Sequence, residues 1–207
     1  MKKSVLDRDP NELRFVYRLS RFLFYWVYKI VWRLQIRHAE RVPLKGSLII
    51  ASNHKSYADP QVVGITIPRP VHFLAKEELF RFRPFGWIIT QCNAHPLKRR
   101  GGDIAALRLS VAILSKNGAL IIFPEGGRGK TDHFQPAKAG LGLLAQKTGA
   151  PILPMYIHNS GHIGKFKKLI VSFGKPIYAN HHHSHQALAD EAMSQIAKLK
   201  QELEEYL

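Results

Sequence analysis

The sequence predicts an α/β fold in which a central, mostly buried sheet is flanked by helices. Apolar runs with the length of strands alternate along the chain with segments whose apolar residues recur at helical spacing. Runs such as residues 48–50 and 120–123 are apolar at every position, which is typical of strands that helices cover on both faces. Ahead of these elements, an aromatic and basic segment predicts a separate amphipathic N-terminal helix.

Five strands and three helices are expected in the body of the chain. The apolar runs place the strands at residues 48–52, 71–75, 119–123, 152–157 and 169–173. Repeated apolar positions place the helices at residues 103–116, 137–147 and 184–207. In a sheet of this kind, ligands collect at the loops that follow the strand ends.

The length of 207 residues suits one substantial domain with a small appendage. We therefore divide the chain into an N-terminal helical segment, residues 1–45, and a main domain, residues 46–207. The single cysteine, Cys92, excludes an intramolecular disulfide framework, so packing must hold the fold together.

A formal charge of +16, from 31 Lys and Arg against 15 Asp and Glu, indicates anionic partners. The composition, 45% hydrophobic and 22% charged, is that of a globular protein and argues against a disordered basic tail. A nucleic-acid-binding protein is disfavoured, because the aromatic residues concentrate in a segment with its own apolar face and no nucleic-acid-binding motif is recognised. We therefore expect a membrane surface and anionic substrates as partners, and no nucleic acid.

Residues 13–36 are the most aromatic part of the chain and predict a helix that lies on a membrane surface. On a helix, their basic side chains fall within an arc of about 160°, opposite an apolar side. Such a helix places cations at anionic head groups and its apolar face in the lipid boundary; the alternative is a core helix with a solvated cationic side. Asp9 as the cap and Pro10 at the first position predict its start. The uncharged stretch, 22–28, is far shorter than the roughly 20 residues of a membrane span.

The first chemical motif, residues 52–60, directly follows an apolar run and contains His54 and Asp59. On one continuous helix this pair would diverge, but across a strand-to-helix turn, with Asp59 starting the helix and Pro60 at its first position, the two side chains can converge. A converged pair makes a general base, since the carboxylate fixes one imidazole nitrogen and leaves the other to take a proton from a hydroxyl. The alternative is that Asp59 only caps a helix and His54 is a hydrogen-bonded loop residue.

The second motif, residues 123–130, follows another apolar run. Its three glycines, Gly126, Gly127 and Gly129, allow the backbone N–H groups to approach an anion closely. Arg128 supplies a fork that matches phosphate, and Glu125 could hold that Arg or a substrate hydroxyl. The motif is neither a Walker loop nor a dinucleotide fingerprint. The alternative is a tight turn with a surface Arg.

A third basic block, Lys98, Arg99 and Arg100, leads into the helix expected from residue 103, and helix N-termini of this kind bind phosphate. Lys138 could add one more cation to the same anion site. The alternative is a solvated basic loop with Asp103 as the helix cap.

The order of these blocks resembles the 1-acyl-sn-glycerol-3-phosphate acyltransferases (lysophosphatidic acid acyltransferases), a family of glycerolipid acyltransferases. The chain reads NHxxxxD at 53–59, a KRxxxD-like block at 98–103, FPEGxR at 123–128 and Ile-Leu-Pro at 152–154. Together these motifs cover roughly residues 46–160. The resemblance implies that residues 46–207 form an acyltransferase domain.

The resemblance also implies a reaction and its site. A fatty acyl group would pass from acyl-CoA or acyl carrier protein to the free hydroxyl of lysophosphatidic acid, making phosphatidic acid in phospholipid biosynthesis. His54 would remove the hydroxyl proton and Asp59 would orient it, without a covalent intermediate. Neither a metal nor a bound cofactor is implied. The candidate substrate-binding residues are Asn53, Arg99, Arg100, Glu125, Gly126, Gly127, Arg128 and Lys138.

Departures from the family pattern leave the acceptor open. The chain has EGGRGK where the family often has EGTRS, which removes a hydroxyl that could contact the phosphate, so another lyso-lipid or amino-lipid acceptor is the alternative. The histidines at 181–183 and 185 are interpreted as a solvated loop, with metal ligation as the alternative. The lysines at 165, 167 and 168 are interpreted as a solvated turn, with contact to anionic lipid as the alternative. We expect the protein at the cytoplasmic face of a bacterial inner membrane.

Overall fold

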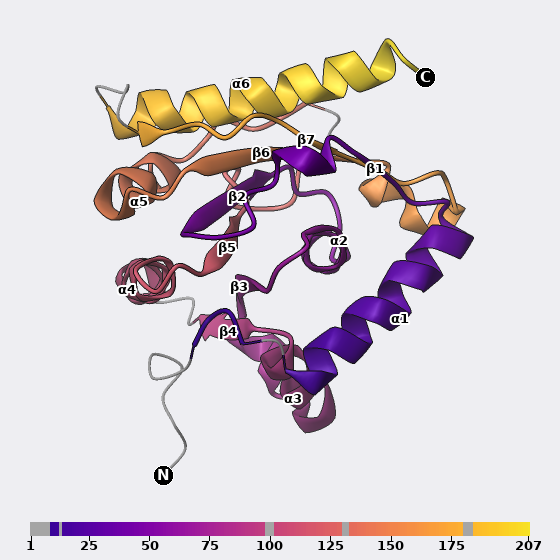
Figure 1. Ribbon diagram of the computed structural model, residues 1–207, viewed down its shortest axis with the longest axis horizontal. Coiled ribbons are helices and arrows are strands. Elements are labelled where there is room, and N and C mark those ends of the chain that lie inside the picture. Colours follow the sequence, from indigo (N-terminus) through magenta and orange to yellow (C-terminus); the bar gives the residue numbers. More distant parts are fainter. Residues whose placement is uncertain (1–8, 13, 98–101, 130–132, 180–183) are drawn as a thin grey trace.

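A seven-stranded sheet forms the centre of the computed structural model, which describes residues 9–12, 14–97, 102–129, 133–179 and 184–207 (Figure 1). The strand order is β1-β7-β6-β2-β5-β3-β4, and every neighbouring pair is parallel except β6 with β7. The strands are β1 Gln35–Arg37, β2 Leu48–Ser52, β3 Val71–Lys76, β4 Ala94–Leu97, β5 Ala119–Ile122, β6 Ile152–His158 and β7 Ile170–Phe173.

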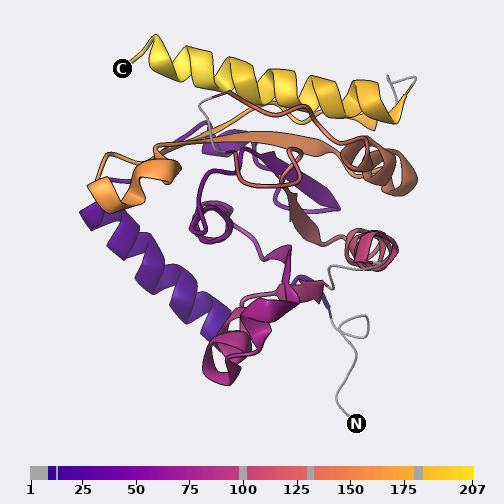
Figure 2. The same cartoon turned by 180° about the vertical axis from the view of Figure 1, so that it is seen from behind.

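Helices cover both faces of this sheet (Figures 1 and 2). Helices α4, α5 and α6 pack on one face, and α1 and α2 pack on the other. The helices are α1 Phe15–Val31, α2 Asp59–Thr66, α3 Arg83–Gln91, α4 Gly102–Leu114, α5 Gly140–Thr148 and α6 His185–Glu204, with short 3-10 turns η2 Ala39–Arg41, η3 Glu77–Phe80 and η4 Ser160–Lys165. The predicted α/β class is therefore confirmed.

Alternate residues of the central strands supply the two cores. In β2, Ile49 and Ala51 belong to the core under α5 and α6, whereas Leu48 and Ile50 belong to the core under α2. Because side chains alternate across a strand, only a strand that is apolar at every position can fill both layers. This is why the uninterrupted apolar runs predicted the central strands well.

The two strands that the sequence did not predict lie at the edges of the sheet, and helix α3 was not predicted either. Strand β1 has only three residues, and it pairs with β7 at one edge. Strand β4 contains Pro96 and forms the opposite edge, where a residue without an N–H is tolerated. Neither segment is a long apolar run, so hydrophobic patterning did not reveal them. The division between residues 45 and 46 stays a prediction, although β1, from the N-terminal segment, joins the main sheet.

Helix α1 is shorter than predicted, and its predicted start is wrong. Asp9 closes a turn instead: its carboxylate accepts from the Asn11 N–H at 2.8 Å. The backbone is extended at Arg14, and the helix begins at Phe15. At the other end, Arg33 has a left-handed backbone (φ 49°), which separates the helix from β1. Among the described residues, no helix is both long and apolar enough to cross a bilayer.

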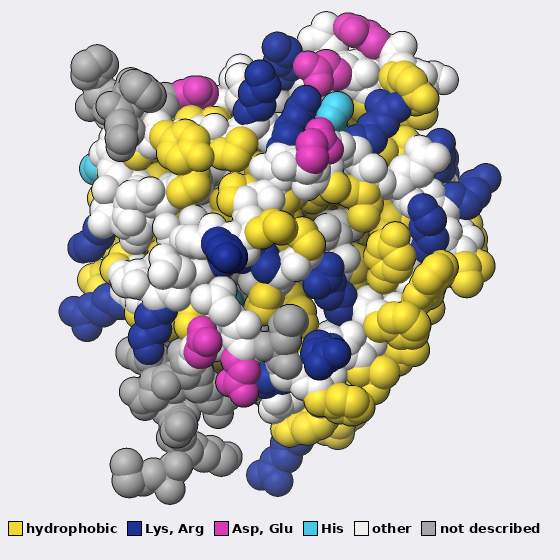
Figure 3. Space-filling model, viewed as in Figure 1, with side chains coloured by type: hydrophobic (Ala, Val, Ile, Leu, Met, Phe, Trp, Pro, Cys, Tyr) yellow, Lys and Arg dark blue, Asp and Glu magenta, His cyan; other side chains and the backbone are white. Residues whose placement is uncertain are grey.

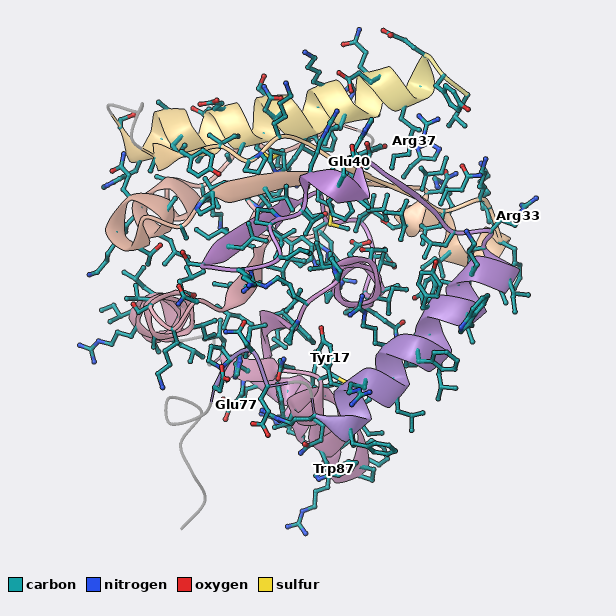
Figure 4. All side chains as sticks on the ribbon, viewed as in Figure 1. Tyr17, Arg33, Arg37, Glu40, Glu77 and Trp87 are labelled. Atoms are coloured by element: carbon teal, nitrogen blue, oxygen red, sulfur yellow. The ribbon has the colours of Figure 1, made fainter. Side chains whose placement is uncertain are left out.

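Helix α1 attaches to the body of the protein through its tyrosines. Tyr17 is buried, and its hydroxyl accepts from the Val71 N–H at 3.1 Å, while the buried Tyr28 donates to Gln61 Oε1 at 2.8 Å. In Figure 4, Tyr17 lies on the inner side of α1. The opposite, outer side of the helix exposes most of its large apolar residues. The helix therefore directs tyrosines inward and leaves aliphatic and aromatic side chains exposed on its outer face.

The contact between α5 and α6 gives a test of the packing. A Cβ at Gly142 would collide with the His185 backbone carbonyl, whereas a Cβ at Gly140 would meet nothing within 4 Å. We expect Gly142→Ala to destabilise the protein by about 1–3 kcal/mol through overpacking. Gly140→Ala should leave the free energy of unfolding within about 1 kcal/mol of the wild type. Urea unfolding followed by circular dichroism measures both variants, and equal stabilities would contradict this packing.

Candidate active site

Two neighbouring strands bring the chemical motifs together. Strands β2 and β5 are parallel neighbours, with Ala51 beside Ile122 at their carboxyl ends. The loop after β2 begins with Asn53 and His54, and the loop after β5 holds residues 123–129. The carboxyl ends of parallel strands lie at one edge of a sheet, so the two loops are adjacent.

Asp59 is the centre of the first loop. Its side chain has no exposed surface, and its Oδ2 lies 2.8 Å from His54 Nδ1. The same oxygen accepts the backbone N–H groups of Lys55 and Ser56, each at 2.7 Å. The predicted convergence of His54 and Asp59 is confirmed. Asp59 thus does more than begin α2, since it also shapes the turn that carries the imidazole.

The surroundings of His54 hold the imidazole in one orientation. A carboxylate only accepts hydrogen bonds, so in the neutral imidazole the proton resides on Nδ1. The ring stacks on Phe123, with centroids 3.9 Å apart and planes 15° from parallel. Within the described part of the chain, Nε2 has no hydrogen-bond partner, and 17% of the side chain is exposed. The imidazole is therefore fixed by Asp59 and Phe123, and its second nitrogen is available to a substrate.

Tyr28 couples α1 to this site. Burial, and secondly the nearby charge of Asp59, raise the pKa of Tyr28 to about 12. The phenol therefore stays protonated at physiological pH and donates to Gln61 on α2, the helix that Asp59 begins. The N-terminal helix is in this way joined to the helix that Asp59 begins.

Glu125 links the two loops through the backbone. Its side chain is buried, with Oε1 accepting from the His54 N–H at 3.2 Å and Oε2 accepting from the Gln135 N–H at 3.0 Å. The Gly129 N–H returns a bond to the His54 carbonyl at 2.8 Å. Glu125 does not hold Arg128, as one interpretation of the sequence suggested, because its carboxylate binds backbone N–H groups and Arg128 binds Tyr57. Glu125 positions the loops, and its contact with substrate stays a prediction.

Arg128 is held by Tyr57, a residue that the sequence analysis did not select. The guanidinium lies 3.6 Å from the centroid of the Tyr57 ring and donates to its hydroxyl at 2.8 Å. Both side chains are exposed. The position of Tyr57 inside NHxxxxD was the available signal, because an aromatic ring is a natural platform for a guanidinium.

Two lysines approach the glycine-rich loop as well. The Lys138 side chain lies against Gly126, and the Lys55 ammonium lies against Gly129. Lys55 was not selected from the sequence, although it directly follows His54. Together with Arg128, these amines give the loop a concentration of positive charge, as a phosphate site requires.

The remaining predicted residues have different outcomes. Asn53 is buried, and its side chain accepts from the Ile157 N–H at 2.8 Å and donates to the Ile157 C=O at 3.0 Å. These bonds connect the loop after β2 to β6. Contact between Asn53 and a substrate stays a prediction. Arg99 and Arg100 lie outside the described residues, as do the histidines at 181–183. Within the described ranges, no three His, Cys, Asp or Glu side chains gather as a metal site would need.

The sequence profile of the acyltransferase family matches residues 33–158, so the protein belongs to this family. The matched stretch includes His54, Asp59 and the glycine-rich loop. Among its relatives is the 1-acyl-sn-glycerol-3-phosphate acyltransferase of Streptococcus pneumoniae, 32% identical over 135 residues, which are 62% of this chain and 49% of the relative. The protein of the same name from Bacillus subtilis is 28% identical over 149 residues, 70% of this chain and 74% of the relative.

The fold is also that of a solved relative. The 1-acyl-sn-glycerophosphate (LPA) acyltransferase PlsC of Thermotoga maritima superposes with a TM-score of 0.77 and 23% sequence identity, over 91% of this chain and 78% of that protein. At this identity the likeness establishes the common fold. The matched part of the chain spans about half the length of the Streptococcus pneumoniae relative.

The glycine-rich loop provides a matched pair of substitutions. Gly126 has φ +71° and lies against Lys138, so we expect Gly126→Ala to destabilise the protein by about 1 kcal/mol or more. Gly127 has no such backbone, and a Cβ there would meet nothing within 4 Å. Gly127→Thr should therefore keep the melting temperature of the wild type. Differential scanning calorimetry of the two variants measures this contrast, and a greater loss at Gly127 would contradict the loop geometry.

Proposed function

We propose that the protein transfers a fatty acyl group from a thioester, acyl-CoA or acyl carrier protein, to the free hydroxyl of lysophosphatidic acid. The product would be phosphatidic acid. The observation that carries the proposal is the buried Asp59 carboxylate bonded to His54 Nδ1, which leaves Nε2 available for a hydroxyl proton. The names of the relatives give the reaction class its second support.

The geometry supports a direct transfer with His54 as the general base. Nε2 takes the acceptor's hydroxyl proton as the oxygen attacks the thioester carbonyl carbon and forms a C–O bond. Asp59 stabilises the imidazolium through Nδ1. When the intermediate collapses, the C–S bond breaks and the imidazolium returns its proton to the departing thiolate. No enzyme nucleophile is required, so Cys92 and Ser56 have no covalent role.

The acceptor's phosphate is assigned to the glycine-rich loop. Arg128 presents a guanidinium that Tyr57 already holds, so less side-chain freedom is lost when a phosphate binds. Lys138 and Lys55 border the same loop, and Arg99 or Arg100 would complete the site. An acceptor with another head group is the competing assignment, favoured by the absence of a hydroxyl at Gly127. A panel of lyso-lipid and amino-lipid acceptors, assayed with both donors, decides between them.

We further propose that the enzyme works on an anionic membrane, at the cytoplasmic face of a bacterial inner membrane. Support comes from the outer face of α1 and from the adjacent α3, whose apolar side chains form a continuous exposed area in Figure 3. Arg18, Lys29 and Arg33 are exposed on or beside α1. The exposed apolar residues are Phe15, Leu19, Phe22, Leu23, Phe24, Trp26, Val27, Ile30 and Val31 on α1, with Phe85, Trp87 and Ile88 on α3.

Loss of the general base should abolish acyl transfer. Purified protein with lysophosphatidic acid and a thioester donor should release free thiol, and His54→Ala should slow this release by about a hundredfold or more. The release is followed with a thiol-reactive dye, using acyl-CoA and acyl carrier protein in parallel.

The matched control is His185→Ala, which removes an exposed histidine at the start of α6. This variant should retain wild-type activity. Undiminished thiol release by a folded His54→Ala protein would refute the mechanism.

Loss of the guanidinium should weaken acceptor binding. We expect Arg128→Ala to raise the acceptor KM about tenfold or more, because a charge-assisted hydrogen bond contributes about 1.5–3 kcal/mol. The donor KM should change little. Steady-state kinetics with each substrate varied in turn measures both constants.

Lys147→Ala, which removes one exposed charge from the last turn of α5, is the control for net charge. A rise in the donor KM alone would show that Arg128 belongs to the donor site instead.

A further inference from the structure

The loop between β6 and β7 is attached to the C-terminal end of α1. Trp32, which follows the helix, stacks on Phe166 with ring centroids 6.0 Å apart and planes 20° from parallel. Its indole N–H donates to the Ile163 carbonyl at 2.8 Å, and Arg33 donates to the Phe166 carbonyl at 3.4 Å. The Leu169 N–H returns a bond to the Trp32 carbonyl at 2.9 Å. These contacts hold the loop and the end of α1 together as one surface.

Residues 165–168, Lys-Phe-Lys-Lys, form the tip of this loop, which we name the KFKK loop. Phe166 has 59% of its surface exposed even though Trp32 covers one side of its ring. Lys165 and Lys167 are exposed on either side of it, and Lys168 is half-buried. Phe166 has a left-handed backbone (φ 50°), which projects the loop at this point. The loop thus presents an exposed aromatic surface with positive charge on either side of it.

We propose that the KFKK loop is a second lipid contact, at the opposite end of α1 from α3, and that its partner is an anionic bilayer. This inference rests on the membrane part of the proposed function. Phe166 enters the head-group boundary beside Ile30 and Val31 of α1, and the lysines bind the anionic lipids around it. Aromatic rings with flanking cations are the usual composition of a protein surface at the membrane interface.

A bilayer fits this surface better than a soluble acidic partner does. The exposed aromatic ring stacks on Trp32, the residue that follows α1, and the outer face of this helix carries exposed Trp26, Ile30 and Val31. Figure 1 shows that α3 lies beside the first turns of α1 and η4 beside its last turns, and Figure 4 labels Arg33 at this latter end. An acidic carrier protein would match the lysines but would leave the exposed apolar residues of α1 in water.

The two ends of α1 together determine how the enzyme lies on the membrane. A single amphipathic helix can roll about its own axis, whereas contacts on two further elements prevent this. The KFKK loop also continues from η4, where Gly161 approaches the Lys55 side chain of the active-site turn: a Cβ at Gly161 would lie 3.4 Å from Lys55 Cβ. The KFKK loop therefore begins four residues after a position that borders the active-site turn.

Vesicle binding tests the proposal, and a double variant of the loop is compared with a control double variant of the same net charge. Lys165→Glu with Lys167→Glu should lower the affinity for vesicles of phosphatidylglycerol and phosphatidylcholine about tenfold in co-sedimentation. Phe166→Ser should lower binding to the same vesicles without a change in charge. Lys147→Glu with Lys198→Glu, on α5 and α6, has the same net charge as the loop double variant and should bind as the wild type does. Thiol release with a short-chain, water-soluble acceptor should stay unchanged in every variant.

Four outcomes would overturn the proposal. Equal losses of vesicle affinity in the loop double variant and in its charge control would show that net charge alone determines the affinity. Unchanged vesicle binding by the loop variants would show that the KFKK loop does not contact the bilayer. A raised KM of the loop double variant for the carrier-protein donor, measured without vesicles, would show that the lysines bind that donor instead. A wild-type protein that does not bind vesicles would refute the membrane assignment as a whole. Absence of thiol release from a vesicle-bound wild type would instead refute the reaction alone.

Discussion

The carboxylate of Asp59 is the interaction on which the site depends. One oxygen of this fully buried side chain accepts from His54 Nδ1 and from the N–H groups of Lys55 and Ser56, all within 2.8 Å. A buried charge without such partners would be costly, so these donors stabilise the carboxylate as the carboxylate orders them. The same residue begins α2, which Tyr28 joins to α1. The orientation of His54, the turn after β2 and the attachment of the N-terminal helix therefore depend on one side chain.

Around Asp59, hydrogen bonds from buried side chains to the backbone hold the loops in place, whereas the cationic side chain of Arg128 lies at the surface. Glu125 binds amides of two separate segments, and Asn53 binds both polar backbone groups of Ile157 on β6. These buried polar side chains hold the positions of His54 and of the glycine-rich loop. Arg128, in contrast, is exposed on Tyr57 and is held by a stacking contact and a single hydrogen bond, which suits its proposed role in binding a phosphate.

Much of this arrangement could be predicted from the sequence because it depends on local pattern. The strand β2 spans the predicted residues, and the spacing of His54 and Asp59 predicted their convergence. Contacts between segments that are far apart in the chain leave no such pattern in the sequence. The stacking of His54 on Phe123, the backbone partners of Glu125 and the packing of Phe166 on Trp32 follow from tertiary approach alone. The start of α1 was misplaced because Asp9 and Pro10 suit a tight turn as well as they suit a helix cap.

We infer that Asp59 holds the neutral His54 imidazole with its proton on Nδ1, so that Nε2 can act as a base. Nitrogen-15 NMR of protein labelled in its histidine rings measures this most directly, with His54 assigned by comparison with His54→Gln. We expect the neutral imidazole to carry its proton on Nδ1, in a strong hydrogen bond, and Nε2 to have the chemical shift of an unprotonated nitrogen. In Asp59→Asn this preference should be lost. A neutral His54 that carries its proton on Nε2 in the wild type would show that Asp59 does not orient the ring as a base.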